Sequence, residues 1–373
     1  MSTDRFKNAL KEIFSFGDIK IDGDRSWDIQ VHNDKFYQRI LTDGSLGFGE
    51  SYMDGWWDCE KLDELVFRIF SNDIDKKHKM NWRTFLKILM PRIINMQSKK
   101  RVFQVADKHF NLGNNLFKAM LDKRMVYTCA YWKNAKNLDE AQEAKLDLVC
   151  KKTNLKPGQT VLELGCGWGG FAKYAAEKYG VKVLGINVSK EQVELGNKLC
   201  KGLPVELRLQ DYREAQGKFD RVISIGLLEH VGYKNYRTYM ETADRCLKDD
   251  GIAFIQAIGG NASQTKFEPW SEKYIFPNAM TPSISQIGKA MEGLFVMEDW
   301  HNFGPDYDKT LMVWHNNFEN AWPELKKNYD ERFRRMWRFY LLTYAGTFRS
   351  RRTQAWQIVM TKPGTRQPAC RVS

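Results

Sequence analysis

The sequence predicts an α/β fold: a doubly wound, mainly parallel sheet with a smaller, mainly helical N-terminal domain. Three observations predict it. From about residue 145, short apolar stretches alternate with helical patterns, and turn residues stand at each junction. A glycine-rich turn, LELGCGWGGF, follows the first of these stretches. The first hundred residues or so lack the alternation and pack glycines and aromatics closely, as in GSLGFGESYMDGWWDC.

The apolar stretches define the expected strands in chain order. The first five strands are expected at residues 160–165, 181–186, 205–210, 219–226 and 251–259. Helices are expected between them; one starts near Phe171 and stops at Gly180, and another starts at Ser189. Strands separated by helices favour parallel pairing through right-handed crossovers.

The end of the chain adds two more expected strands, LFVMEDWHNFG and AWQIVMTK, after an aromatic and proline-bearing stretch at 260–283. A helical excursion at about 309–352 separates the two.

Composition narrows the class of partner. The 58 Lys and Arg residues outnumber the 46 Asp and Glu residues, so the formal charge of +12 favours nucleic acid or a phospholipid surface. Seven cysteines without a C-x-x-C pair indicate reduced thiols, a cytosolic setting and no metal site such as structural zinc. The N-terminus lacks the pattern of a secretory leader, and no stretch approaches about 18 charge-free apolar residues. We therefore expect neither export nor a membrane-spanning helix.

Two basic, amphipathic stretches suit an anionic surface, at residues 73–101 and at residues 331–352. One interpretation is that they rest on anionic lipid, where each near-surface cation contributes about 1 kcal/mol. The other is that they are ordinary helices burying one face in their own domain. The sequence leaves both interpretations open.

Gly165, Gly167 and Gly170 form a G-x-G-x-x-G turn between a strand and a helix. Such a turn lets the backbone approach a nucleotide-like ligand at the carboxyl edge of the sheet. A dinucleotide site also needs an acidic residue about 20 positions further on. Asn187 stands there instead, which argues against a nicotinamide cofactor.

Acidic residues occur elsewhere, at Glu163 inside the first strand and at Asp211 after the third. Glu-x-Gly-x-Gly with a strand-end Gln-Asp resembles the pattern of S-adenosylmethionine-dependent methyltransferases. The resemblance implies a Rossmann-like sheet of seven strands, the last one antiparallel, that binds S-adenosylmethionine. The implied cofactor-binding positions are Tyr127, Thr128, Glu163, Gly165, Gly167, Asn187, Gln192, Gln210, Asp211, Tyr212 and Ile225. Gln192 also fits an S-x-x-Q capping box, in which it finishes a helix start and need not line the pocket.

Longer blocks carry a closer resemblance. YTCAYW, ELGCGWGG, GLLEHVG, EPWSEKYIFP and MEDWHNFGPDYDKTL together resemble the bacterial cyclopropane-fatty-acyl-phospholipid synthases, over nearly the whole chain. The resemblance implies transfer of a methylene group from S-adenosylmethionine to the cis double bond of an acyl chain in a membrane phospholipid, through a carbocation. It also implies a lipid-interaction and dimerisation domain at 1–98, a catalytic domain at 99–373, a homodimer, and a cytoplasmic protein held peripherally at the inner face of the membrane.

The same resemblance implies bicarbonate as the proton acceptor. The main chain at Cys129 and Ile258 and the side chains of Glu229 and Tyr307 would hold it, and Gln256 occupies the position of the family's histidine. An amide donates hydrogen bonds but does not titrate, so Gln256 is expected to hold bicarbonate and not to protonate it. Alternative roles stay open, since Cys129 also suits a small buried apolar residue and Glu229 a helix cap.

A carbocation reacts quickly with water, so a dry pocket with aromatic faces is expected. The aromatic candidates are Tyr127, Tyr131, Trp132, Phe303 and Tyr307. Other activities remain as alternatives. A fatty-acyl methyltransferase giving a methyl-branched or methylene product stays open because of Gln256. A non-enzymatic lipid-binding protein is disfavoured, because a purely structural relative need not keep the whole set together: Glu163, Gly165, Gly167, Asp211, Glu229 and Tyr307. An RNA methyltransferase is disfavoured, and no nucleic-acid partner is expected, because GLLEHVG replaces the base-stacking motif expected after the fourth strand.

Overall fold

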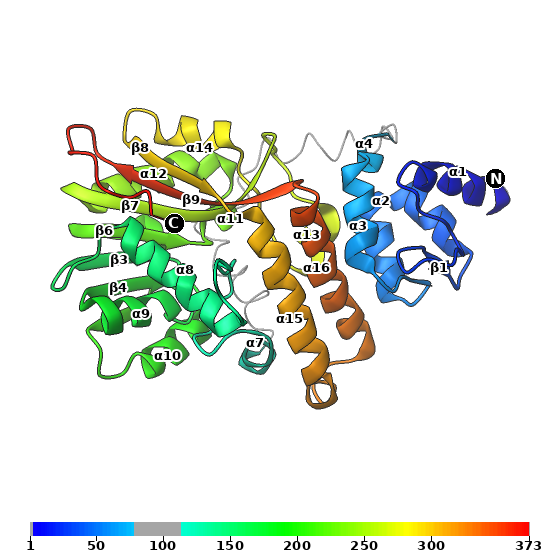
Figure 1. Ribbon diagram of the computed structural model, residues 1–373, viewed down its shortest axis with the longest axis horizontal. Helices are drawn as coiled ribbons and strands as arrows, with labels where there is room; N and C mark the ends of the chain where they lie inside the picture. Colours follow the sequence, from blue (N-terminus) through cyan, green and yellow to red (C-terminus); the bar gives the residue numbers. More distant parts are fainter. Residues whose placement is uncertain (1–2, 78–112, 373) are drawn as a thin grey trace. The chain divides into compact units, whose positions relative to one another are not determined.

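The computed structural model describes residues 3–77 and 113–372 of the chain, which divide into two units (Figure 1). Unit 1 contains residues 3–77, Lys266–Pro277 and Tyr307–Thr353. Unit 2 contains residues 113–265, Asn278–Asp306 and residues 354–372. The predicted domain boundary between residues 98 and 99 lies outside the described residues. Residues 78–101 of the basic stretch 73–101 also lie outside them.

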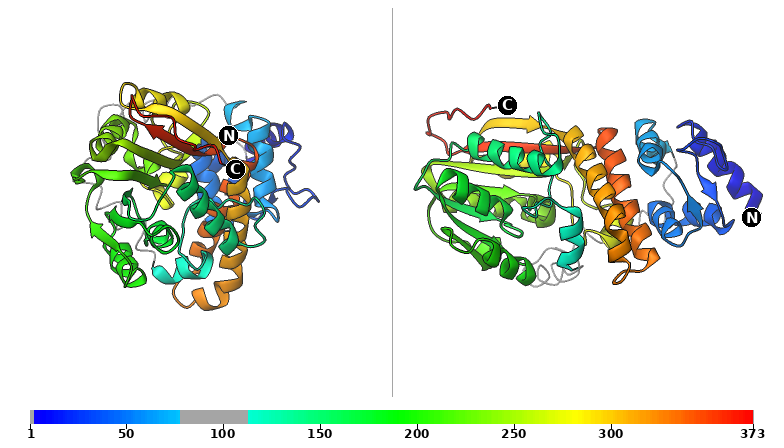
Figure 2. Two further views of the ribbon diagram at one scale, coloured as in Figure 1. Left: turned by 60° about the vertical axis from the view of Figure 1, so that its left-hand side comes forward. Right: turned by 60° about the horizontal axis from the view of Figure 1, so that its bottom comes forward.

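Unit 2 is built on a seven-stranded sheet with the strand order β5-β4-β3-β6-β7-β9-β8. The strands are β3 (Thr160–Leu164), β4 (Lys182–Asn187), β5 (Val205–Leu209), β6 (Phe219–Ile225), β7 (Leu247–Gly260), β8 (Val296–Asn302) and β9 (Thr353–Thr361). The pairs β4–β5, β3–β4, β3–β6 and β6–β7 are parallel, and β9 runs antiparallel to β8. In Figure 2 the yellow to red strands β8 and β9 form one edge of this sheet. The predicted doubly wound, Rossmann-like sheet is confirmed.

One strand starts well before its expected range. β7 begins at Leu247, before the expected start at residue 251, and its pairing with β6 shifts register between Phe219 and Arg221. The early part of β7 carries polar residues, half-buried Lys248 and exposed Asp249 and Asp250. It therefore lacks the continuous apolar run by which a buried parallel strand is recognised in sequence.

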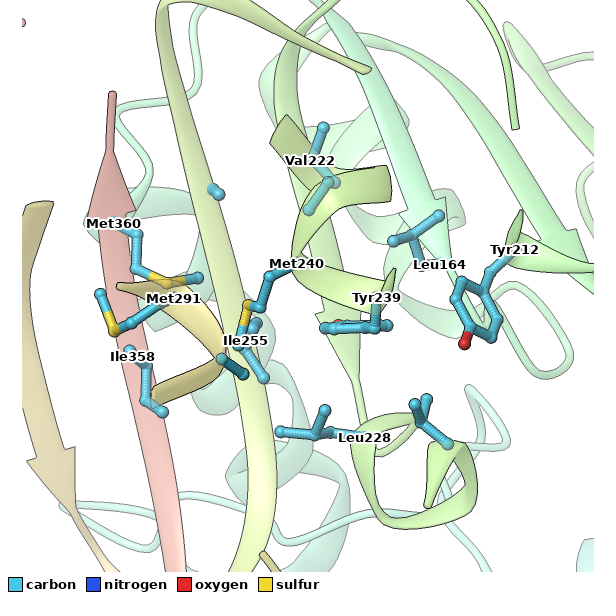
Figure 3. Close-up of a cluster of buried hydrophobic side chains, with 14 of the residues drawn as sticks. Leu164, Tyr212, Val222, Leu228, Tyr239, Met240, Ile255, Met291, Ile358 and Met360 are labelled. Atoms are coloured by element: carbon cyan, nitrogen blue, oxygen red, sulfur yellow. The ribbon is translucent and has the colours of Figure 1, made fainter. Parts of the chain in front are cut away.

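Helices cover both faces of the sheet in unit 2. They are α7 (Asn114–Met120), α8 (Leu138–Lys152), α9 (Gly170–Tyr179), α10 (Lys190–Leu199), α11 (Leu228–Val231), α12 (Tyr236–Cys246) and α14 (Ile284–Met291). Alternate strand residues reach opposite faces. Val161 packs in the cluster with α8 and α9, whereas Leu162 packs in the cluster with α12 and α14. Figure 3 shows this second cluster, in which Tyr239 and Met240 of α12 lie over the strands.

Unit 1 is mainly helical and joins early and late parts of the chain. Its elements are α1 (Thr3–Ser15), β1 (Gln30–Val31), α2 (Lys35–Met53), β2 (Trp57–Asp58), α3 (Leu62–Ser71), α4 (Ile74–Lys77), α13 (Pro269–Tyr274), α15 (Gly304–Leu325, whose first residues belong to unit 2) and α16 (Glu331–Arg349). α16 packs on α3 closely enough that a Cβ at Gly346 would lie 2.6 Å from the Asp63 carbonyl oxygen. In the described ranges, no helix has the length and apolar character needed to cross a bilayer.

The basic stretch 331–352 is α16 and its end, and most of its arginines form ion pairs within unit 1. Its ion pairs join Arg332 to Asp54, Arg334 to Glu319, Arg335 to Asp58, Arg349 to Asp63 and Asp308, and Arg352 to Asp75. Trp337 and Tyr340 on the same helix are buried. Of the two interpretations of this stretch, the contacts favour an ordinary packed helix.

Candidate functional site

The glycine turn joins β3 to α9 at the carboxyl ends of the parallel strands. Gly165 and Gly167 have φ angles of +79° and +53°, which glycine adopts without strain. Gly170 opens α9, and a Cβ there would lie 2.7 Å from the Arg124 carbonyl oxygen. A Cβ at Gly167 would meet no atom within 4 Å. Gly170 is therefore needed for packing, whereas Gly167 leaves open space beside the turn for a ligand.

Asn187, the last residue of β4, connects two of the expected cofactor positions. Its side-chain amide donates to Gln192 Oε1 at 2.7 Å and to the Gly167 carbonyl oxygen at 3.3 Å. Ser189 caps α10 by accepting from the Gln192 backbone N–H. Gln192 therefore serves the helix start through its main chain, while its side chain is held at the glycine turn.

Asp211 follows β5 and is held by an ion pair. It is buried, and its two carboxylate oxygens accept from Arg213 at 2.6 and 2.8 Å. The backbone N–H of Gln210 donates to the Asn187 carbonyl oxygen at 2.8 Å, which keeps this segment beside the end of β4. Tyr212 turns away into the core, where its ring meets Tyr239 edge-on at 5.6 Å (Figure 3).

A buried ionisable pair lies beneath the cofactor positions. Lys145 of α8 is fully buried and donates to Thr128 Oγ1 at 3.0 Å. Glu163 is 3% exposed, and its Oε2 has no hydrogen-bond partner among the described residues. Burial raises the pKa of Glu163 and lowers the pKa of Lys145, and each group partly offsets the shift of the other. A ligand hydroxyl or ammonium that donates to Glu163 Oε2 would stabilise its ionised form, which fits a nucleoside-bearing cofactor.

The segment 127–132 lies over the end of β6, which Ile225 terminates. At Gly226, the next residue, a Cβ would lie 2.8 Å from Thr128 Cγ2. Further along the segment, the Trp132 N–H donates to Asp306 Oδ2 at 2.9 Å. These contacts hold the segment at the carboxyl edge of the sheet, where ligands of open α/β sheets bind.

Aromatic rings accompany this segment. The ring of Tyr127 meets Phe117 edge-on at 5.1 Å. Tyr131 lies edge-on to His301 at 6.0 Å and to Phe303 at 6.4 Å. The expected aromatic faces of unit 2 are therefore present beside Cys129, although each also packs against a neighbour.

Glu229 lies in the first turn of α11 and is 7% exposed. Its Oε1 accepts from the Ile258 backbone N–H at 2.5 Å, and its Oε2 is buried without a partner in the described part of the chain. Burial raises the pKa of Glu229 to about 7, against the opposing effect of the Ile258 N–H. The carboxyl group thus binds the neighbouring strand β7 through Ile258, and the backbone N–H of Glu229 also favours its ionised form.

Gln256 lies on β7, two residues before Ile258. Its Nε2 donates a long hydrogen bond of 3.4 Å to the Cys129 carbonyl oxygen. The Cys129 thiol is buried and directed to the Ala130 carbonyl oxygen at 3.3 Å. The structure therefore brings Cys129, Glu229, Gln256 and Ile258 together at one end of β7.

Tyr307 belongs to unit 1, where it lies in the first turn of α15, not in the loop expected from sequence. It is buried, with its ring centroid 4.5 Å from that of Phe348 and 6.0 Å from that of Trp314. In the part of the chain that the structure describes, no cluster of three or more His, Cys, Asp or Glu side chains is arranged for a metal ion.

Two polar residues of this site were not singled out from sequence. Lys145 had no signal, because a lysine in a helix is normally exposed. Gln357 gave a weak sequence signal, because it is a polar residue inside the mainly apolar stretch AWQIVMTK. In the structure its side chain is fully buried. Its Nε2 donates to Gln256 Oε1 at 3.1 Å.

Known proteins resemble the chain over most of its length. Residues 97–358 match a family described as mycolic acid cyclopropane synthetase. The chain is 48% identical over 359 residues to the cyclopropane-fatty-acyl-phospholipid synthase of Escherichia coli (strain K12), covering 96% of this chain and 94% of that protein. It is 30% identical over 354 residues to tuberculostearic acid methyltransferase UfaA1 of Mycobacterium tuberculosis, covering 89% and 82% of the two chains.

Solved structures give the same result for the fold. The cyclopropane synthase MmaA2 from Mycobacterium tuberculosis is similar with a TM-score of 0.66 and 27% identity, over 70% of this chain and 98% of that one. The mycolic acid cyclopropane synthase CmaA1, complexed with SAH and CTAB, has a TM-score of 0.64 and 28% identity over the same shares. The resemblance expected from the sequence motifs is confirmed.

Proposed function

The chain belongs to the mycolic acid cyclopropane synthetase family, and on that premise we propose which acceptor it uses. It is an S-adenosylmethionine-dependent methyltransferase of cyclopropane fatty acid synthesis. The proposed acceptor is the cis double bond of an unsaturated acyl chain in a membrane phospholipid. The enzyme transfers the methyl group of S-adenosylmethionine to this bond, which leaves S-adenosylhomocysteine and a carbocation. Loss of a proton from the added methyl group closes the ring, so that the net addition is one methylene unit.

The observation that carries the proposal is the buried polar group at the end of β7. Glu229 and Gln256 meet Ile258 and Cys129 there, through the hydrogen bonds described above. An unactivated alkene is a weak nucleophile, so the chemistry needs a site that excludes water yet accepts a proton. Buried polar groups beside aromatic rings, at the edge of the sheet that holds the glycine turn, meet both needs.

We propose bicarbonate as the group that takes the proton, since when bound it supplies a basic oxygen. Two observations support the fit. Glu229 Oε2 is a buried oxygen without a partner among the described residues, and a pKa of about 7 lets its carboxyl carry a proton to donate to an anion. Gln256 Nε2 has a second N–H besides the one directed at Cys129. The Ile258 N–H already donates to Glu229, so an anion there would share that donor.

The cofactor part rests on Glu163, Asn187, Gln192 and Asp211 around the glycine turn. We propose that these residues bind the nucleoside and amino-acid parts of S-adenosylmethionine beside Gly167. The other expected cofactor contacts lie on the same edge of the sheet: Tyr127, Thr128, Gly165, Gln210 and Ile225. Tyr212 differs from them, because its ring packs in the core. The role of the Tyr307 side chain in proton transfer also stays a proposal.

We further propose that the enzyme binds peripherally to the inner face of the membrane and forms a homodimer through residues 1–98. The net charge of +12 supports attraction to anionic lipid. Residues 331–352 are poor candidates for the contact, because most of their arginines are ion-paired inside unit 1. Residues 73–101 are therefore the better candidate.

A product assay tests the proposal. Purified protein is incubated with methyl-labelled S-adenosylmethionine and liposomes that contain a cis-monounsaturated phospholipid, and the fatty acids are identified by mass spectrometry. A product heavier by one methylene unit and without the alkene is expected. A methyl-branched or methylene product would support the second candidate, a fatty-acyl methyltransferase, which the non-titrating Gln256 keeps open. Label found only in RNA would overturn both.

A second assay tests the membrane contact. Sedimentation with liposomes is expected to require anionic lipid and to weaken as salt is raised, because screening shortens the reach of surface charge. Binding that is equal on neutral and anionic liposomes at all salt concentrations would overturn the proposed contact.

A further inference from the structure

We infer that Gln357 is a positioning residue, which orients the Gln256 amide so that its NH2 group faces Cys129 and the anion expected beside it. The inference rests on the proposed function, in which that anion takes the proton. Gln357 lies on β9, next to β7 in the sheet, and its side chain is fully buried.

The direction of the hydrogen bonds carries the inference. Gln357 Nε2 donates to Gln256 Oε1 at 3.1 Å, and Gln256 Nε2 donates to the Cys129 carbonyl oxygen at 3.4 Å. If the Gln256 amide were reversed, its oxygen would face the Cys129 carbonyl oxygen, and its NH2 would face the NH2 of Gln357. Both new contacts pair like groups, so the Cys129 carbonyl and the Gln357 donor act in the same direction, and the Gln357 bond is the shorter of the two.

The surroundings of Gln357 on the side of β8 are compatible with Gln357 acting as the donor to Gln256. Its register partner on β8 is His301. The Gln357 amide interacts with the imidazole and raises its pKa, although burial and Lys152 together lower it. Gln357 Oε1 and His301 Nδ1 are both buried without a hydrogen-bond partner in the described ranges. A neutral imidazole with its proton on Nδ1 would complement that oxygen.

The orientation matters because an amide has two ends of opposite polarity. With the NH2 end toward the site, Gln256 offers a donor to an oxyanion; with the oxygen end, it repels one. Gln256 stands where the family resemblance implies a histidine. A glutamine there needs a neighbour to decide which end is presented, and the structure assigns this task to Gln357.

The test is the bicarbonate dependence of the rate in buffer depleted of carbon dioxide. Gln357→Met removes the donor at similar side-chain length. The bicarbonate concentration for half-maximal rate is expected to rise about three- to tenfold, the size of one buried neutral hydrogen bond, with the KM for S-adenosylmethionine unchanged. Gln354→Met is the matched control, because Gln354 is a buried glutamine on the same strand whose side-chain oxygen accepts from Asn302. It is expected to keep the wild-type bicarbonate dependence.

A double-mutant cycle separates positioning from general structure. In a Gln256→Met background, Gln357→Met is expected to add no further change in bicarbonate dependence. The inference is overturned if Gln357→Met behaves like the control, adds its full effect in that background, or raises the KM for S-adenosylmethionine equally. Thermal unfolding checks each variant, and Gln357→Leu replaces Gln357→Met if the latter does not fold.

The outcomes also separate this inference from the proposed function. If the wild-type rate does not depend on bicarbonate, the proposed proton acceptor fails and the inference fails with it. If the wild-type rate depends on bicarbonate and Gln357→Met does not alter that dependence, only the role of Gln357 is refuted.

Discussion

The Ile258 backbone N–H donates to Glu229 Oε1 at 2.5 Å and leaves Glu229 Oε2 buried without a partner among the described residues. One carboxyl oxygen is therefore anchored to β7, and the other is the oxygen that the proposed anion would contact. Because the anchor comes from the main chain, it survives every side-chain substitution at Ile258 short of proline. The consequences of this arrangement can be tested at Glu229 itself.

Glu229→Gln is expected to lower kcat by at least about 100-fold, the usual scale for losing a group that handles a proton. The amide oxygen of glutamine still accepts from Ile258, so the fold should be kept. Initial rates with labelled S-adenosylmethionine measure the loss, and circular dichroism checks the fold. A variant with near wild-type kcat would remove Glu229 from the chemistry.

Glu229 also predicts a pH dependence of stability. Burial raises its pKa from the ordinary 4.5 to about 7, so in this interval the folded state keeps a proton that the unfolded state releases. Stability from this group is present at low pH and is lost as pH rises from about 4.5 through about 7, by at most about 3 kcal/mol. Urea unfolding at pH 5 and pH 8 should show Glu229→Gln gaining stability relative to wild type at the higher pH. An equal difference at both pH values would contradict the buried, shifted carboxyl.

The glycine turn predicts opposite effects at two of its positions. Gly170→Ala should destabilise the fold, because its Cβ would lie 2.7 Å from a backbone oxygen of Arg124. Gly167→Ala has room within the protein, so it should cost only about 1 to 2 kcal/mol of backbone strain. Its methyl group would instead enter the space proposed for the cofactor. Calorimetric titration with S-adenosylmethionine and thermal melts should therefore separate them: weaker binding for Gly167→Ala, and a lower melting temperature for Gly170→Ala.

Cys129→Ala is expected to be mild. Gln256 meets the carbonyl oxygen of Cys129, whereas the thiol turns to Ala130. The variant should keep most of the wild-type rate and lose about 1 kcal/mol of unfolding free energy. Steady-state rates and chemical denaturation measure the two quantities. A loss of activity as large as that of Glu229→Gln would assign the thiol a direct role.

Arg349→Met distinguishes packing from lipid contact in α16. Arg349 donates to both oxygens of Asp308 at 3.0 and 3.1 Å and pairs with Asp63 at 2.7 Å. Its loss should lower stability by about 2 kcal/mol and leave liposome binding close to that of Lys326→Met, which removes the same charge from an exposed position. Sedimentation and denaturation measure both. Weaker liposome binding than the control, at unchanged stability, would restore α16 as a lipid contact.

Much of the sheet was predictable because its signals are local. A strand buried on both faces is a nearly continuous apolar run, as in TVLELG with Glu163 as its one charged residue, and the turn residues at its ends are visible in sequence. The polar start of β7 was not predicted as a strand, because Lys248 to Asp250 interrupt the apolar run by which such strands are recognised.

The membership of unit 1 was not predictable in this way. Nothing local in α15 and α16 shows that they share a unit with α2 and α3, because the contact depends on residues far apart in the chain. The close approach at Gly346 became visible only in the fold.

By itself, the sequence determined where the strands and the glycine turn lie and which chemical groups are available at Glu163, Asp211, Glu229 and Gln256. These follow from local patterns and from the family motifs. Only the tertiary structure decided which of those groups meet. Gln256 bonds Cys129 across 127 positions and Gln357 across 101, and Lys145 becomes a buried cation because α8 packs on the sheet. Partners so distant in sequence are chosen by strand order and packing, and burial then sets the proton affinity of Glu229.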